Sequence, residues 1–65
     1  MKIDQTNQQI LEYLAQGLTV KEIAKKVFRS HRTIEGRVYK MRKETNSKSY
    51  GQLIAWFNDY RKLEV

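Results

Sequence analysis

A chain of 65 residues without a cysteine has few ways to form a stable fold. Domains of this length bury only about 60% of their unfolded surface, so most of them rely on disulfides, a metal ion, a partner or tightly packed helices. Disulfides are excluded, and one histidine, His31, without cysteines or clustered carboxylates makes no metal site. We therefore expect a single domain over residues 1–65 that is held together by helix packing, without a cofactor.

The spacing of apolar residues predicts an all-α fold. The chain has no proline and only three glycines, and its apolar residues recur at intervals of three and four, which is typical of helices with one buried face. The pattern predicts a four-helix, bundle-like domain with helices over about 5–16, 20–27, 31–44 and 49–62. The residues expected to face its core are Ile10, Leu11, Leu14, Val20, Ile23, Ala24, Val27, Ile34, Val38, Met41, Leu53, Ile54, Phe57 and Tyr60.

Polar residues mark the expected helix ends. The predicted N-caps are Asp4, Thr19, Ser30 and either Ser47 or Ser49. Thr19 and Glu22 have the spacing of a capping box, in which each side chain binds a free backbone amide of the other residue. Gly17 can adopt the left-handed conformation that ends many helices. A turn at Phe28 and Arg29 is expected to separate the second helix from the third.

Positive charge is concentrated in one part of the chain. The net charge is +6, and residues 29–48 carry +5 of it, with seven Lys and Arg against Glu35 and Glu44. Such a concentration is typical of a surface that binds a polyanion. A solvated helix face has the same composition, so charge alone leaves both interpretations open.

The order of the middle elements matches a helix-turn-helix. A short helix, a tight turn and a third helix that begins at Ser30 and is rich in Arg and Lys have the geometry that places a recognition helix in the major groove of DNA. A sequence motif supports the same interpretation. The run LAQGLTVKEIA at residues 14–24, followed by Ser30-x-x-Thr33-Ile34-Glu35, resembles the signature of the LuxR-type (GerE-like) DNA-binding domain. The resemblance extends from about Ile3 to Phe57.

The resemblance implies a four-helix domain that binds DNA as a dimer and lies mostly at the C-terminus of response regulators and quorum-sensing regulators. The sequence departs from the family pattern at several positions. The family often has an acidic residue where Asn7 and Gln9 stand, an apolar residue at Arg29, a lysine at Glu35 and a histidine at Arg37. A base contact by lysine at position 35 therefore cannot be carried over.

The candidate DNA-binding residues lie mainly on the third helix. They are Lys21, Arg32, Thr33, Glu35, Gly36, Tyr39, Lys40, Arg42 and Lys43. Glu35 either accepts a hydrogen bond from a cytosine amino group or pairs with Arg32 or Tyr39 and holds them in place, and we favour the second role. Gly36 either lets the helix backbone approach DNA closely, or packs against a neighbouring helix, or is a mildly unfavourable helix residue that the fold tolerates. His31 is expected to be an ordinary surface residue beside the cap.

The last helix has more apolar residues than one small core needs. The residues that fit a core stripe are Leu53, Ile54, Phe57 and Tyr60, and those that extend it are Tyr50, Ala55 and Trp56. The candidates for a dimer interface are Tyr50, Trp56 and Tyr60. The alternative is that Trp56 completes the core of a monomer. Off DNA the domain can remain monomeric, because two adjacent half-sites raise the effective concentration of two copies.

The residues offer no chemistry of catalysis. They contain no nucleophile and base pair, phosphate-binding glycine loop or paired acids, so we expect neither an enzyme nor a small-molecule substrate. There is no apolar run long enough for a membrane span and no signal peptide, and the cytoplasm is the expected location. The expected partner is double-stranded DNA, bound by a homodimer that belongs to a transcription regulator, with a receiver or sensory domain upstream in a longer chain. The competing hypotheses are a protein-interaction module that uses the aromatic last helix and a promoter-reading domain like that of a sigma factor.

Overall fold

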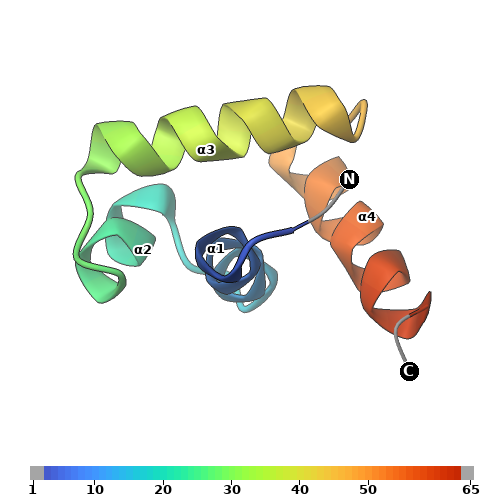
Figure 1. Ribbon diagram of the computed structural model, residues 1–65, viewed down its shortest axis with the longest axis horizontal. Helices are drawn as coiled ribbons and strands as arrows, with labels where there is room; N and C mark the ends of the chain where they lie inside the picture. Colours follow the sequence, from blue (N-terminus) through green and yellow to red (C-terminus); the bar gives the residue numbers. More distant parts are fainter. Residues whose placement is uncertain (1–2, 64–65) are drawn as a thin grey trace.

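The computed structural model describes residues 3–63 and contains four helices and no strand in that range (Figure 1). The helices are α1 (Gln5–Ala15), α2 (Val20–Lys26), α3 (His31–Glu44) and α4 (Tyr50–Leu63). The predicted all-α class is confirmed, and each predicted helix end lies within one residue of the observed one. In Figure 1, α3 runs along one side of the molecule, α1 lies under its middle, and α2 and α4 lie at its two ends.

The core lies where the four helices meet around α1. Helix α1 packs against each of the other three. The buried apolar residues are Ile10, Leu11, Leu14, Val20, Ile23, Ala24, Ile34, Val38, Met41, Leu53 and Phe57. The predicted core is thus confirmed apart from Val27, Ile54 and Tyr60, which are partly buried at its edge. Val27 is the C-cap that follows α2, and Ile54 and Tyr60 flank the buried residues of α4, so the three cover the core rather than fill it.

Each helix begins at a polar cap. The backbone amide of Asn7 donates to Asp4 Oδ1 at 2.7 Å, and the predicted capping box between Thr19 and Glu22 is formed, with hydrogen bonds of 2.9 and 3.2 Å. At the start of α4, the amide of Gln52 donates to Ser49 Oγ at 3.2 Å. Ser49, and not the buried Ser47, is therefore the cap of α4.

Three helices end in the same tight turn, with one residue in the left-handed conformation. These residues are Gly17 with φ 94°, Phe28 with φ 56° and Asn46 with φ 57°. Backbone hydrogen bonds of 2.7–3.1 Å close the turns, from Leu18 to Tyr13, from Arg29 to Ala24 and from Ser47 to Arg42. This pattern is the Schellman motif, which satisfies carbonyl groups at a helix end and reverses the chain sharply. It brings α3 directly after α2 and α4 directly after α3.

Candidate nucleic-acid interface

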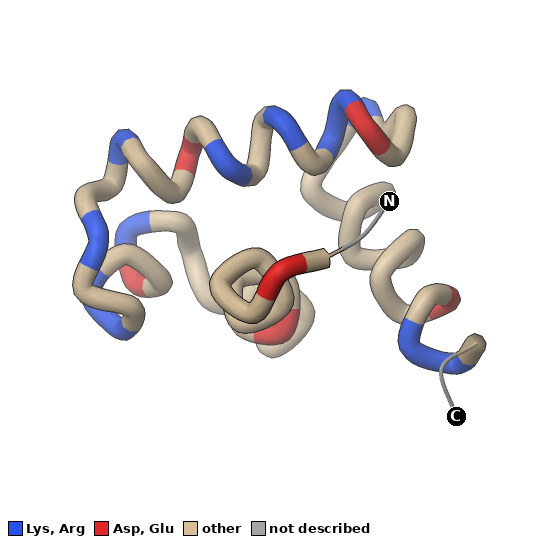
Figure 2. The backbone as a smooth tube through the Cα atoms, in the orientation of Figure 1, with Lys and Arg blue, Asp and Glu red and all other residues tan. Residues whose placement is uncertain are grey.

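The basic surface of the molecule follows α3. Figure 2 shows Lys and Arg along α3, on α2 and in the turn between them, whereas α1 has none in its helix. Helix α3 buries Ile34, Val38 and Met41 on one side and turns the opposite side outward. The exposed residues of α3, which form this outward face, are His31, Arg32, Thr33, Glu35, Gly36, Tyr39, Lys40, Lys43 and Glu44. A helix exposed on one side and rigidly packed on the other has the form needed to enter a groove.

The middle of this outward face lacks a side chain at one point. Arg32, Gly36, Tyr39 and Lys43 follow one another at intervals of four, three and four, which places them on the same side of α3. A Cβ atom added at Gly36 would meet nothing within 4 Å. The alternative that Gly36 makes room for a neighbouring helix is therefore wrong. The backbone of α3 is thus open to its surroundings at Gly36.

Tyr39 and Lys43 form a pair on the outward face. The Nζ atom of Lys43 lies 5.0 Å from the centroid of the Tyr39 ring, which is 55% exposed. A cation over an aromatic ring is attracted to the ring's negative face. The pair therefore presents an ammonium group and a phenol hydroxyl together at the surface.

Arg42 is partly buried, whereas the other candidate cations of α3 are exposed. Its Nη2 atom donates to the backbone oxygen of Lys48, and its guanidinium lies 5.7 Å from the centroid of the Tyr50 ring. The side chain is partly buried, and it ties the end of α3 to the start of α4. The sequence placed Arg42 among the DNA contacts from its charge and its position on the helix; in the structure it lines a pocket with Tyr39 and Lys43, but its guanidinium is bound at the turn into α4.

Arg37, which is not among the candidate residues predicted from the sequence, links α3 to the start of α1. Its Nη1 atom donates to Asn7 Oδ1 at 3.0 Å and lies 3.6 Å from Asp4 Oδ2. Arg37 follows the buried Ile34 by three positions, so it lies beside the core stripe of α3. It holds the first turn of α1 against α3 and points away from the outward face.

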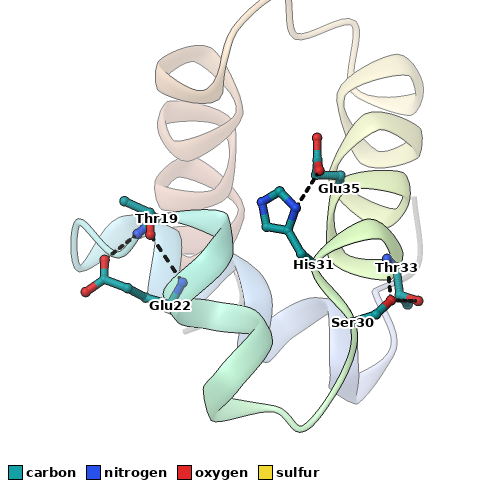
Figure 3. A network of polar contacts seen from close by, with 6 residues as sticks. All are labelled: Thr19, Glu22, Ser30, His31, Thr33 and Glu35. Carbon is teal, nitrogen blue, oxygen red and sulfur yellow. Dashed lines mark hydrogen bonds and ion pairs between the residues drawn. The ribbon is translucent and has the colours of Figure 1, made fainter.

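Glu35 has a different partner from the ones predicted. Its Oε1 atom lies 2.8 Å from Nδ1 of His31 (Figure 3), whereas Arg32 or Tyr39 was expected to pair with it. His31 precedes Glu35 by four positions and lies on the same side of the helix, while Tyr39 is taken up by Lys43. The expected surface position of His31 is confirmed, since its side chain is 55% exposed.

The cap of α3 also leaves polar groups at the surface. The amide of Thr33 donates to Ser30 Oγ at 3.0 Å, and the two hydroxyl groups share a hydrogen bond of 2.8 Å (Figure 3). Lys21 lies exposed in the first turn of α2. In the same turn, the backbone amide of Thr19 donates to the carboxylate of Glu22, and this contact with Thr19 lowers the pKa of Glu22.

The three aromatic residues proposed for a dimer interface do not form one patch. Trp56 and Tyr60 stack, with ring centroids 5.2 Å apart and planes inclined by 22°, and both are partly buried against the core. Tyr50 precedes Trp56 by six positions, which places it on another side of α4, beside Arg42. The structure thus joins two of the three.

The capped α2, the tight turn and the basic outward face of α3 define a helix-turn-helix DNA-binding domain. The chain belongs to the GerE family, the bacterial regulatory proteins of the luxR family, whose model matches residues 4–57. No curated protein and no solved structure matches the chain. The family is one of DNA-binding transcription regulators and not of enzymes, which confirms the expectation from the sequence. Among residues 3–63, no helix is both long and apolar enough to cross a membrane.

Proposed function

We propose that the domain binds duplex DNA in a sequence-specific manner, with α3 in the major groove, as the DNA-reading part of a bacterial transcription regulator. The observation that carries this proposal is the outward face of α3, where Arg32, Tyr39 and Lys43 surround the open backbone of Gly36. Cations attract the phosphates, the bare backbone allows a close approach, and side chains with donors can read base edges.

The exposed residues divide into two proposed roles. Arg32 and Tyr39 lie beside Gly36 and are the proposed base contacts. The proposed phosphate contacts are Lys21, Thr33, Lys40 and Lys43, which surround them with ammonium and hydroxyl groups. Most hydrogen bonds between proteins and DNA go to the backbone, so the larger set belongs there. We assign Arg42 to the turn between α3 and α4, because its guanidinium is hydrogen-bonded to the backbone oxygen of Lys48.

The experiment compares the affinity of each variant for a selected duplex and for a scrambled one. Arg32→Ala is expected to lower the affinity for the selected duplex more than that for the scrambled duplex, by about 1 to 3 kcal/mol. Lys21→Ala is expected to weaken both alike. If Arg32→Ala lowers the affinity for both duplexes equally, α3 is not the element that reads the DNA sequence. A module that binds only proteins would show no salt-sensitive shift on any DNA.

We further propose that two copies bind adjacent half-sites through α4, with Trp56 and Tyr60 at the contact. The two stacked rings form a rigid aromatic edge, and such residues anchor many interfaces. Residues 1–65 are proposed to act as one domain within a longer regulator that carries a receiver or sensory domain upstream. The proposed location is the bacterial cytoplasm, where the DNA lies.

A further inference from the structure

The outward face of α3 carries a carboxylate among its cations. Glu35 lies in the second turn of the helix, and its side chain and that of His31 are 54% and 55% exposed. We propose that Glu35, oriented by His31, selects a cytosine in the DNA site. This inference rests on the function proposed above and names the base that one edge of α3 reads.

An ionised carboxylate finds few favourable contacts on DNA. It only accepts hydrogen bonds, and the phosphates repel it. In the major groove the available donors are the amino groups of cytosine and adenine. In the major groove the adenine amino group lies between two acceptors that repel a carboxylate, its own N7 and O4 of the paired thymine, whereas the cytosine amino group lies beside only one, O6 of the paired guanine. Glu35 therefore favours cytosine.

His31 prepares the carboxylate for this contact. The distance of 2.8 Å between His31 Nδ1 and Glu35 Oε1 fits a hydrogen bond donated by the imidazole, since the carboxylate only accepts. Figure 3 shows both side chains on one side of α3, away from the Ser30 and Thr33 cap. With Oε1 held, Oε2 remains for a base. Because the side chain is ordered before DNA binds, less rotamer entropy is lost on binding, and His31 acts as a positioning residue.

The first experiment selects binding sites for the full chain from a randomised duplex library. Wild type is compared with Glu35→Gln and with Glu44→Gln, a matched control, because each variant replaces an exposed glutamate of α3 by its amide. Both substitutions raise the net charge by one, so both should increase the non-specific affinity for DNA equally. Wild type is expected to enrich cytosine at one position by about fivefold or more. Glutamine pairs with both N6 and N7 of adenine, so Glu35→Gln should move that preference to adenine, and Glu44→Gln should keep cytosine.

The second experiment places N4-methylcytosine at the selected position. The methyl group replaces the amino hydrogen in the major groove and leaves the base pair intact. Wild type should bind this duplex about fivefold more weakly, and Glu35→Gln should bind both duplexes equally. His31→Ala should fold normally by circular dichroism and enrich cytosine less than wild type.

The roles of Glu35 and His31 and the binding of DNA itself are each contradicted by a different result. If Glu35→Gln selects the same base as wild type, or wild type tolerates the methyl group, Glu35 is not the reader. Unchanged enrichment by His31→Ala would remove the positioning role. If wild type enriches no sequence at all, the proposed function fails together with this inference.

Discussion

Phe28 holds the turn of the helix-turn-helix in a conformation that suits glycine better. Its φ is 56° and its side chain is 93% exposed, so the ring gains little by packing in the domain. The left-handed conformation costs a residue with a Cβ roughly 1–2 kcal/mol. The fold accepts this cost because the Schellman turn aligns α2 with α3.

Replacing Phe28 by glycine should stabilise the domain. The substitution relieves the backbone strain, but glycine has greater freedom in the unfolded chain, which offsets part of the effect. The free energy of unfolding should therefore rise by about 0.5–1 kcal/mol. Thermal unfolding should show a Tm about 2–8 °C higher. Phe28→Ala is the control, because it removes the ring and retains a Cβ. If alanine stabilises as much as glycine, the exposed ring and not the backbone is the source of the cost.

Residue by residue, the sequence predicts contacts that are local and misses those that depend on the choice between neighbours. The caps at Asp4 and Thr19 depend on three residues of chain, and both are present. The partner of Glu35 depends on which of several nearby side chains is free, and the prediction was wrong. The bond between Arg37 and Asn7 joins residues thirty positions apart, so no local pattern contained it.

At the scale of the element, the capping box of α2 makes stability depend on pH. Hydrogen bonds from Thr19 lower the pKa of Glu22 below its ordinary value of 4.5. The stabilisation is therefore fully present above pH 4.5 and is lost as pH falls through the pKa of the folded state.

Glu22→Gln tests this dependence. Glutamine keeps an acceptor for the Thr19 amide but has no charge to lose, so it should be less stable than wild type at pH 7. Chemical denaturation at several pH values should show the difference between the two shrinking below pH 4.5. A difference that stays constant down to pH 2 would show that the charge of Glu22 contributes nothing to the box.

Helix α4 serves the core with one side and offers an aromatic edge with another. Leu53 and Phe57 are fully buried, whereas Trp56 is partly buried and stacked on Tyr60. The sequence predicted the width of this apolar surface and placed Tyr50 in it. Tyr50 instead packs beside Arg42, a choice set by the turn between α3 and α4.

Trp56→Ala should separate the core from the proposed interface. Loss of a partly buried ring is expected to lower stability by about 1–3 kcal/mol and to leave the helices formed. Binding to a duplex with two half-sites should lose its cooperativity, while affinity for a single half-site should remain. Circular dichroism monitors the fold. Unfolding, or unchanged cooperativity, would identify Trp56 as a residue of the core only.

For the molecule as a whole, charge sets the strength of DNA binding. If each copy neutralises about four to six phosphates, the logarithm of the association constant should fall with the logarithm of salt concentration at a slope near −4 to −5, at about −0.9 per phosphate. Fluorescence anisotropy between 50 and 300 mM salt, roughly the range over which counterion release is usually followed, measures this slope. A slope flatter than about −2 would contradict a helix seated in the groove.

The link through Arg42 has a geometric consequence for the whole molecule. Its guanidinium joins the end of α3 to Lys48 and Tyr50, across the turn that leads into α4. In the proposed dimer, α4 of one copy meets α4 of the other, so the inclination between α3 and α4 sets how far apart the two recognition helices lie. DNA repeats its major groove about every 34 Å along one face. Arg42 thus fixes the angle between α3 and α4, and through this angle it determines which separation of half-sites in an operator the dimer can bind.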